Sequence, residues 1–164
     1  MDTIFLDTVG LVALWNRRDQ WHVVAKEAFA KLLTREVRFV STTFVLLECG
    51  NAAARHPFRA DVLRLRDELL DDGLLIEPTA TDCEQAWAAY ERGDAGNAGI
   101  VDHTSFVVMR RLGLTEAFTL PSRWFRHAVL RRCSETLTVW LVLASSHPGP
   151  SWRDRGAFFL RPRH

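Results

Sequence analysis

The sequence lacks several features that would assign it to common classes of protein. No apolar run in the 164 residues approaches the roughly 18 that a membrane-spanning helix requires, and no basic region typical of a secretory signal precedes the first strand-like segment. Three cysteines are present, and they form neither a CxxC pair nor a Cys/His set with zinc-ligand spacing. We therefore expect free thiols at Cys49, Cys83 and Cys133 in a cytoplasmic protein, rather than disulfides or zinc.

The net charge of +1 conceals an uneven distribution along the chain. Residues 1–120 contain 13 Lys and Arg against 18 Asp and Glu, a net charge of −5. Residues 121–164 contain 8 Arg against 2 acids, a net charge of +6. A basic segment of this kind raises affinity for nucleic acid through contacts with phosphates. The alternative, a surface extension without that role, is equally compatible with the composition.

Hydrophobic patterning predicts an α/β fold. A chain of this length that is 48% hydrophobic can form one well-buried domain, and helix-spaced apolar patterns separate short apolar runs that predict strands at 3–6, 37–41, 74–76 and 117–120. Alternation of this kind implies a central parallel sheet covered on both faces, here a three-layer α/β/α fold with four or five strands. The fifth strand would lie at 137–144. We assign 1–144 to the domain and 145–164 to an Arg-rich tail.

Three acids lie where carboxylates meet in such a fold. Asp7 directly follows the first predicted strand, Glu48 lies on a helix predicted over 44–56, and Asp102 begins the helix after a glycine-rich loop. Ligands bind at the carboxyl ends of strands in open α/β sheets, and converging carboxylates repel one another unless a cation lies between them. The spacing suggests a metal site, although a single Asp at a helix start is more often an N-cap.

The neighbours of two of these acids give further expectations. Apolar residues at 45–47 flank Glu48, so we expect a buried carboxylate there, and an unpaired buried carboxylate is costly. His103 would project about 100° away from Asp102 on a helix, which favours a surface position or a supporting role over catalysis.

Hydroxyl and carboxyl side chains also mark the predicted starts of helices. We expect Thr8 to cap the helix after the first strand and Thr42 or Thr43 to cap the helix that carries Glu48. Thr81 or Asp82 is the expected cap of a later helix.

Several segments resemble the motifs of a known family. They are Phe-Leu-Asp-Thr at 5–8, Thr-Thr-Phe-Val-Leu-Leu-Glu at 42–48, and the long Val-Asp-His-Thr-Ser-Phe-Val-Val-Met-Arg-Arg-Leu-Gly at 101–113, followed by Thr-Glu-Ala-Phe-Thr at 115–119. Residues 1–120 as a whole resemble the PIN-domain family, specifically the VapC-type toxin ribonucleases of type II toxin–antitoxin pairs. The segment at 101–113 is long and specific, whereas the segment at 5–8 alone would be weak.

The resemblance implies a Mg²⁺-dependent endoribonuclease, with Mn²⁺ as a substitute, which hydrolyses RNA phosphodiester bonds with a metal-activated water. Asp7 and Asp102 would be direct ligands, and Glu48 would bind the metal directly, bind it through water, or orient the attacking water. The family also implies a small antitoxin partner and a homodimer. Asp94 stands where many relatives carry a further acid, and a turn residue is an equal alternative. Thr8 and Ser105 would support the ligands or cap helices.

The resemblance fails at one position. After the fourth strand, relatives usually carry an Asp followed by a basic residue and an aromatic, whereas this chain reads Leu-Pro-Ser-Arg-Trp-Phe at 120–125. Arg123 and Phe125 align, and Ser122 or Pro121 replaces the acid. The alternative function is therefore a catalytically weakened PIN-like protein that binds RNA or a partner.

Overall fold

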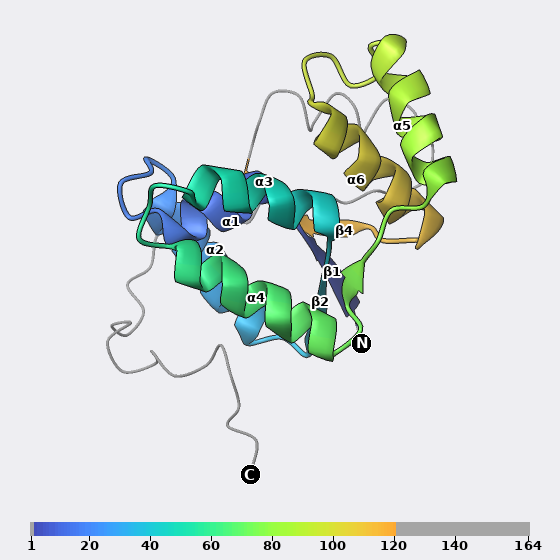
Figure 1. Cartoon of the computed structure of the whole chain (residues 1–164). Helices are drawn as coiled ribbons and strands as arrows, with labels where there is room; N and C mark the ends of the chain where they lie inside the picture. The colour runs from blue at the N-terminus through green and yellow to red at the C-terminus, as the bar shows by residue number, and fades with distance from the viewer. Residues whose placement is uncertain (1, 121–164) are drawn as a thin grey trace.

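The structure is a computed structural model, and it describes residues 2–120. Its four strands form one parallel sheet in the order β3-β2-β1-β4 (Figure 1). The strands are β1 (Asp2–Leu6), β2 (Val37–Thr42), β3 (Leu75–Ile76) and β4 (Glu116–Phe118). The four predicted strands are confirmed, with ends shifted by one or two residues. The predicted strand at 137–144 and the tail at 145–164 lie outside the described residues, so the domain boundary stays a prediction.

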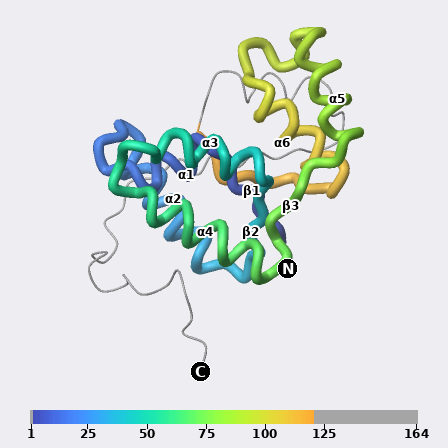
Figure 2. The backbone as a smooth tube through the Cα atoms, in the orientation of Figure 1, coloured from blue at the N-terminus to red at the C-terminus, as the bar shows by residue number. Residues whose placement is uncertain are grey.

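Six helices connect these strands and cover the sheet, which confirms the predicted three-layer α/β/α fold. The contacts of α1 with α2 and α3, and of α3 with α4, gather the first four helices on one side, while α5 packs against α6 on the other (Figures 1 and 2). None of the helices described is long and apolar enough to cross a membrane. The helices are α1 (Thr8–Trp15), α2 (His22–Leu33), α3 (Thr43–Ala53), α4 (Arg59–Asp71), α5 (Ala80–Glu91) and α6 (Ile100–Arg111).

The central strand β1 brings its carboxyl end to the point where the strand order reverses. It pairs with β2 on one side and with β4 on the other, where Leu6 lies opposite Phe118. The amide of Asp7 extends the second ladder by donating to the carbonyl oxygen of Phe118 at 3.2 Å. Crevices outside such a reversal are the usual ligand sites of open α/β sheets. Asp7 therefore enters that crevice directly from the sheet.

Tight packing holds α1 and α2 against the sheet. Phe29, on α2, packs edge-on against Phe118 at a ring-centroid distance of 5.1 Å and stacks on Phe39 at 5.3 Å, which ties the helix layer to the sheet. Gly10, on α1, has no side chain to hold it away, and a Cβ there would lie 2.5 Å from the carbonyl oxygen of Phe118. Because contacts that short do not occur, only glycine allows α1 to approach the strand so closely.

Two predicted helix caps are wrong and one is confirmed. The helix α1 begins at Thr8 itself, with Asp7 in the capping position, and the Thr8 hydroxyl donates to Glu48 and caps no helix. Thr79, rather than Thr81 or Asp82, caps α5, and Asp82 completes a capping box with it. Thr42 caps α3 as predicted, by accepting a hydrogen bond from the amide of Val45.

Candidate active site

Asp7 is the most enclosed of the predicted acids. Its residue surface is only 2% exposed, and Thr119, just after β4, donates from Oγ1 to Asp7 Oδ2 at 2.6 Å. Burial raises the pKa of Asp7 to about 7, and the Thr119 hydrogen bond opposes that rise. The negative charges of Asp102 and Glu48 raise the pKa further. The structure thus brings Asp7, Asp102 and Glu48 close enough for their charges to interact.

Each of the other two acids receives a hydrogen bond that fixes its orientation. Asp102 is the third residue of α6, and its Oδ2 accepts from the amide of Gly99 at 2.8 Å. Glu48 Oε2 accepts from the Thr8 hydroxyl at 2.6 Å, across 40 residues of sequence. Hydrogen bonds from neutral donors hold carboxylates in place without cancelling their charge. Both carboxylates therefore remain charged oxygen donors of defined orientation.

The expectation that Glu48 is buried is wrong. Glu48 is exposed, and its neighbour Leu47 is 66% exposed, because this side of α3 faces away from the core. Cys49 is the buried residue at this point of the helix, and burial raises the pKa of its thiol to about 12, helped by the negative charges of Asp7 and Glu48. Glu48 reaches the other acids from the solvent side.

Asp94 lies in the glycine-rich loop before α6 and pairs with Arg92. It directly follows Gly93, whose φ of 66° is easily adopted only by glycine. Asp94 Oδ2 accepts from Arg92 Nη2 at 2.8 Å and Nε at 3.1 Å. Its predicted place as an additional acid stays a prediction.

Two residues on α6 differ from expectation in their surroundings. His103 is buried, with its ring 5.5 Å from Tyr90 in an edge-on contact, so the surface alternative is wrong and the supporting role stays a prediction. Burial lowers the pKa of His103, against the opposing effects of Asp102 and Asp94. Ser105 lies inside α6, which excludes capping, and its buried hydroxyl has no hydrogen-bond partner within the described part of the chain. A supporting role for Ser105 stays a prediction.

The acids do not form a closed cage. Within residues 2–120, no three His, Cys, Asp or Glu side chains form a ready-made group of metal ligands. Mg²⁺ rarely needs one, because it keeps several waters and binds through one or two carboxylates together with substrate phosphate oxygens. The oxygen donors present match that ion in chemical type.

Comparison with known proteins now identifies the fold family. The family model described as PIN domain matches residues 4–129. The chain belongs to the PIN-domain family. This PIN domain is 33% identical over 121 residues to the protein named 23S rRNA-specific endonuclease VapC20 from two strains of Mycobacterium tuberculosis, covering 70% of this chain and 86% of the relative.

A solved structure supports the same relationship. This PIN domain matches the crystal structure of Mycobacterium tuberculosis VapC20, described as a Sarcin-Ricin loop cleaving toxin, with a TM-score of 0.64 and 28% sequence identity. The match covers 74% of this chain and 92% of that one.

Sequence reasoning missed Thr119, which holds Asp7 in this PIN domain. One signal was present: a hydroxyl residue directly after β4, at the same edge of the sheet as Asp7. Polar residues that follow neighbouring parallel strands converge at that edge. Ser122, where we predict that an acid of the family is replaced, lies outside the described residues.

Proposed function

We propose that this PIN domain is a metal-dependent endoribonuclease and the toxin of a toxin–antitoxin pair. The observation that carries the proposal is the buried Asp7 carboxylate, whose pKa of about 7 reflects burial and the charges of Asp102 and Glu48. Burial and mutual repulsion disfavour the ionised acids, and a bound cation would offset both effects. The named activity of the VapC20 relatives, endonuclease cleavage of 23S rRNA, supports the reaction class.

The chain's own residues would divide the work. Asp7 and Asp102 would hold Mg²⁺ or Mn²⁺, with Glu48 either sharing the ion or orienting the attacking water. When bound, such an ion lowers the pKa of a coordinated water and offsets charge on the phosphoryl oxygens. Thr119 keeps Oδ2 of Asp7 in a fixed direction, and Thr8 does the same for Oε2 of Glu48. Because Glu48 is exposed, its carboxylate is open to the solvent from which an attacking water would come.

The partners proposed are an RNA substrate, a small antitoxin protein and a second copy of the chain in a homodimer, all in the cytoplasm. The solved relative is described as cleaving the sarcin–ricin loop. That loop is accordingly the first RNA to test.

A second candidate is a PIN domain that binds RNA or a partner without efficient cleavage. The sequence favours this candidate at Ser122. The neutral hydroxyl of Ser122 stands where relatives usually carry a negatively charged Asp. Losing that charge would weaken metal affinity. In a Ser122→Asp variant, a higher cleavage rate or tighter metal binding than the parent would favour this second candidate.

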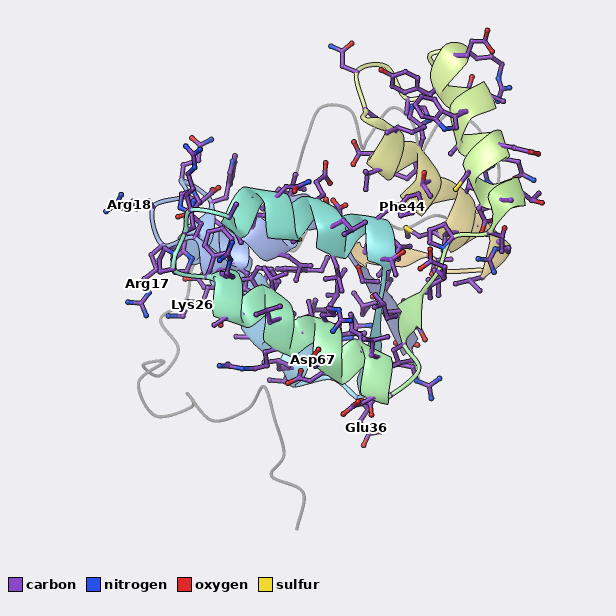
Figure 3. All side chains as sticks on the ribbon, viewed as in Figure 1. Arg17, Arg18, Lys26, Glu36, Phe44 and Asp67 are labelled. Carbon is purple, nitrogen blue, oxygen red and sulfur yellow. The ribbon has the colours of Figure 1, made fainter. Side chains whose placement is uncertain are left out.

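The deciding experiment is cleavage of 23S rRNA and of a sarcin–ricin loop oligonucleotide with Mg²⁺, Mn²⁺ or EDTA. We expect metal-dependent cleavage by the parent and a loss of at least about 100-fold in the variants Asp7→Asn and Asp102→Asn. Asp67→Asn is the matched control, because Asp67 is 67% exposed on α4 (Figure 3). Cleavage that persists unchanged in both site variants would overturn the assigned site. RNA binding without cleavage by the parent would favour the second candidate.

A further inference from the structure

Two loops at the far end of the molecule carry a concentration of positive charge. Arg17 and Arg18 lie between α1 and α2, and Arg55 and Arg59 lie at the junction of α3 and α4; all four are exposed. Within residues 2–120, the ion pairs involve other arginines, and none of these four takes part in one. We call these four residues the arginine patch.

Aromatic packing holds the two loops together. Trp15, the last residue of α1, stacks on Phe58 with ring centroids 6.3 Å apart, and His56 stacks on the same ring at 5.3 Å. Phe58 is buried, so both ring contacts belong to the hydrophobic core. Arg17 and Arg18 therefore occupy the same end of the molecule as His56 and its neighbours.

Two acids near the patch offset part of its charge. Asp19 lies in the same loop, and its Oδ1 accepts from the amide of Trp21 at 2.8 Å. Asp61, on the first turn of α4, is 3.9 Å from Arg64. Four arginines against these two acids leave the two loops with a net positive charge, in a part of the chain, residues 1–120, whose net charge is −5.

Fold stability accounts for only some of these arginines. Arg17, Arg18 and Arg55 follow the carboxyl ends of α1 and α3, where cations interact favourably with the helix dipole. Arg59 is the first residue of α4, where a cation is unfavourable. An anionic ligand would compensate that placement.

The patch is connected to the acids by two helices. Both α1 and α3 begin at the carboxyl edge of the sheet, where the acids lie, pack against each other, and end at the patch. At 1.5 Å per residue, α1 separates Asp7 from the patch by about 12 Å, and the part of α3 from Glu48 to Ala53 is about 8 Å long. Figure 3 shows Arg17 and Arg18 projecting from the end of the molecule opposite Phe44, which lies at the start of α3.

We propose that the arginine patch binds the phosphate backbone of the RNA substrate at a distance from the scissile bond. This inference rests on the proposed ribonuclease function and adds to it a second point of contact. Guanidinium groups bind phosphates in bidentate geometry, and each phosphate contact releases condensed counterions. A strand that runs along the exposed side of α3 would have one phosphate at the acids and others at the patch.

The test measures RNA binding by the parent in EDTA, where the proposed cleavage is silent, at several salt concentrations. The variants Arg17→Gln/Arg18→Gln and Arg55→Gln/Arg59→Gln should each reduce the slope of log K against log salt by about 1.5, since two phosphate contacts are lost. The control Arg38→Gln/Arg110→Gln removes two exposed charges from β2 and α6, away from the patch, and should leave the slope unchanged. If one patch variant fails to fold, the other still decides.

A kinetic comparison gives a second readout. With Mg²⁺, both patch variants should lower kcat/KM for a long RNA and leave cleavage of a dinucleotide unchanged, because a dinucleotide is too short to reach the patch. Salt slopes equal to those of the control, or no RNA binding by the parent, would overturn the inference. Loss of affinity for the antitoxin alone would overturn it too and would make the patch a protein interface. Failure of the proposed function is distinct: the parent would then cleave no RNA with either metal.

Discussion

Thr119 donates a 2.6 Å hydrogen bond to Asp7 across 112 residues of sequence. The bond joins the ends of β1 and β4, the two strands between which the sheet order reverses. It also opposes the rise in the pKa of Asp7 that burial causes. One hydroxyl thus contributes both to the shape of the candidate site and to the charge of its central acid.

Replacing Thr119 by Val should move the pH dependence of cleavage. Val has a similar shape and no donor, so the pKa of Asp7 should rise further. Because a proton on Asp7 competes with the metal, the acidic limb of the pH–rate profile at subsaturating Mg²⁺ should then shift upward. The profile is measured between pH 6 and 9 with Mg²⁺. Thr119→Ser keeps a donor and should keep the parent profile; an identical shift in both variants would contradict this role.

Asp7 should make the metal-free protein less stable as pH rises. Asp7 ionises near 3.8 in the unfolded chain and near 7 in the folded protein. Between these values the folded state retains a proton that the unfolded state has lost, so the free energy of unfolding falls, by on the order of 4 kcal/mol in all. Urea denaturation in EDTA at pH 4 and pH 8 measures the fall. Asp7→Asn should flatten it, and an equal pH dependence in parent and variant would refute the assignment.

Two glycine substitutions should have opposite effects on stability. In Gly10→Ala the new Cβ meets the Phe118 carbonyl oxygen, which belongs to backbone and cannot rotate away. We expect a loss of about 1–3 kcal/mol in the free energy of unfolding. Gly50 lies within α3, and a Cβ added there would meet no atom within 4 Å, so Gly50→Ala should gain about 0.5–1 kcal/mol. Thermal and urea denaturation check both, and destabilisation by Gly50→Ala would contradict the account.

The pair formed by Arg111 and Asp82 should stabilise the packing of α5 on α6. Arg111 Nε and Nη2 each donate to one oxygen of the buried Asp82 carboxylate at 2.9 Å. A lysine cannot form this fork, so Arg111→Lys should lower the free energy of unfolding by about 1–3 kcal/mol. Arg110→Lys, at the exposed neighbouring position, is the control. Equal denaturation midpoints for the two variants would exclude a contribution from the fork.

Local patterns in the sequence predicted the secondary structure and the choice of acids. A short apolar run before Asp7 indicates a strand because strands bury alternate or continuous apolar residues, and the acid follows directly. The cap of α5 was misplaced by two residues because Thr79 and Thr81 carry the same hydroxyl group, and only the backbone conformation selects one. Such patterns extend over only a few residues of sequence. The predicted caps and strand ends are therefore wrong by no more than a few residues.

The sequence by itself determined the parallel α/β architecture and put Asp7, Glu48 and Asp102 at the edge where its strands end, because periodicity and chain order are properties of the chain alone. Only the tertiary structure decided that Glu48 is exposed, that His103 is buried and that Thr119 holds Asp7. Burial and pKa depend on atoms that approach from distant parts of the chain. For that reason the sequence supplies the acids of the candidate site, whereas packing sets the pKa of Asp7.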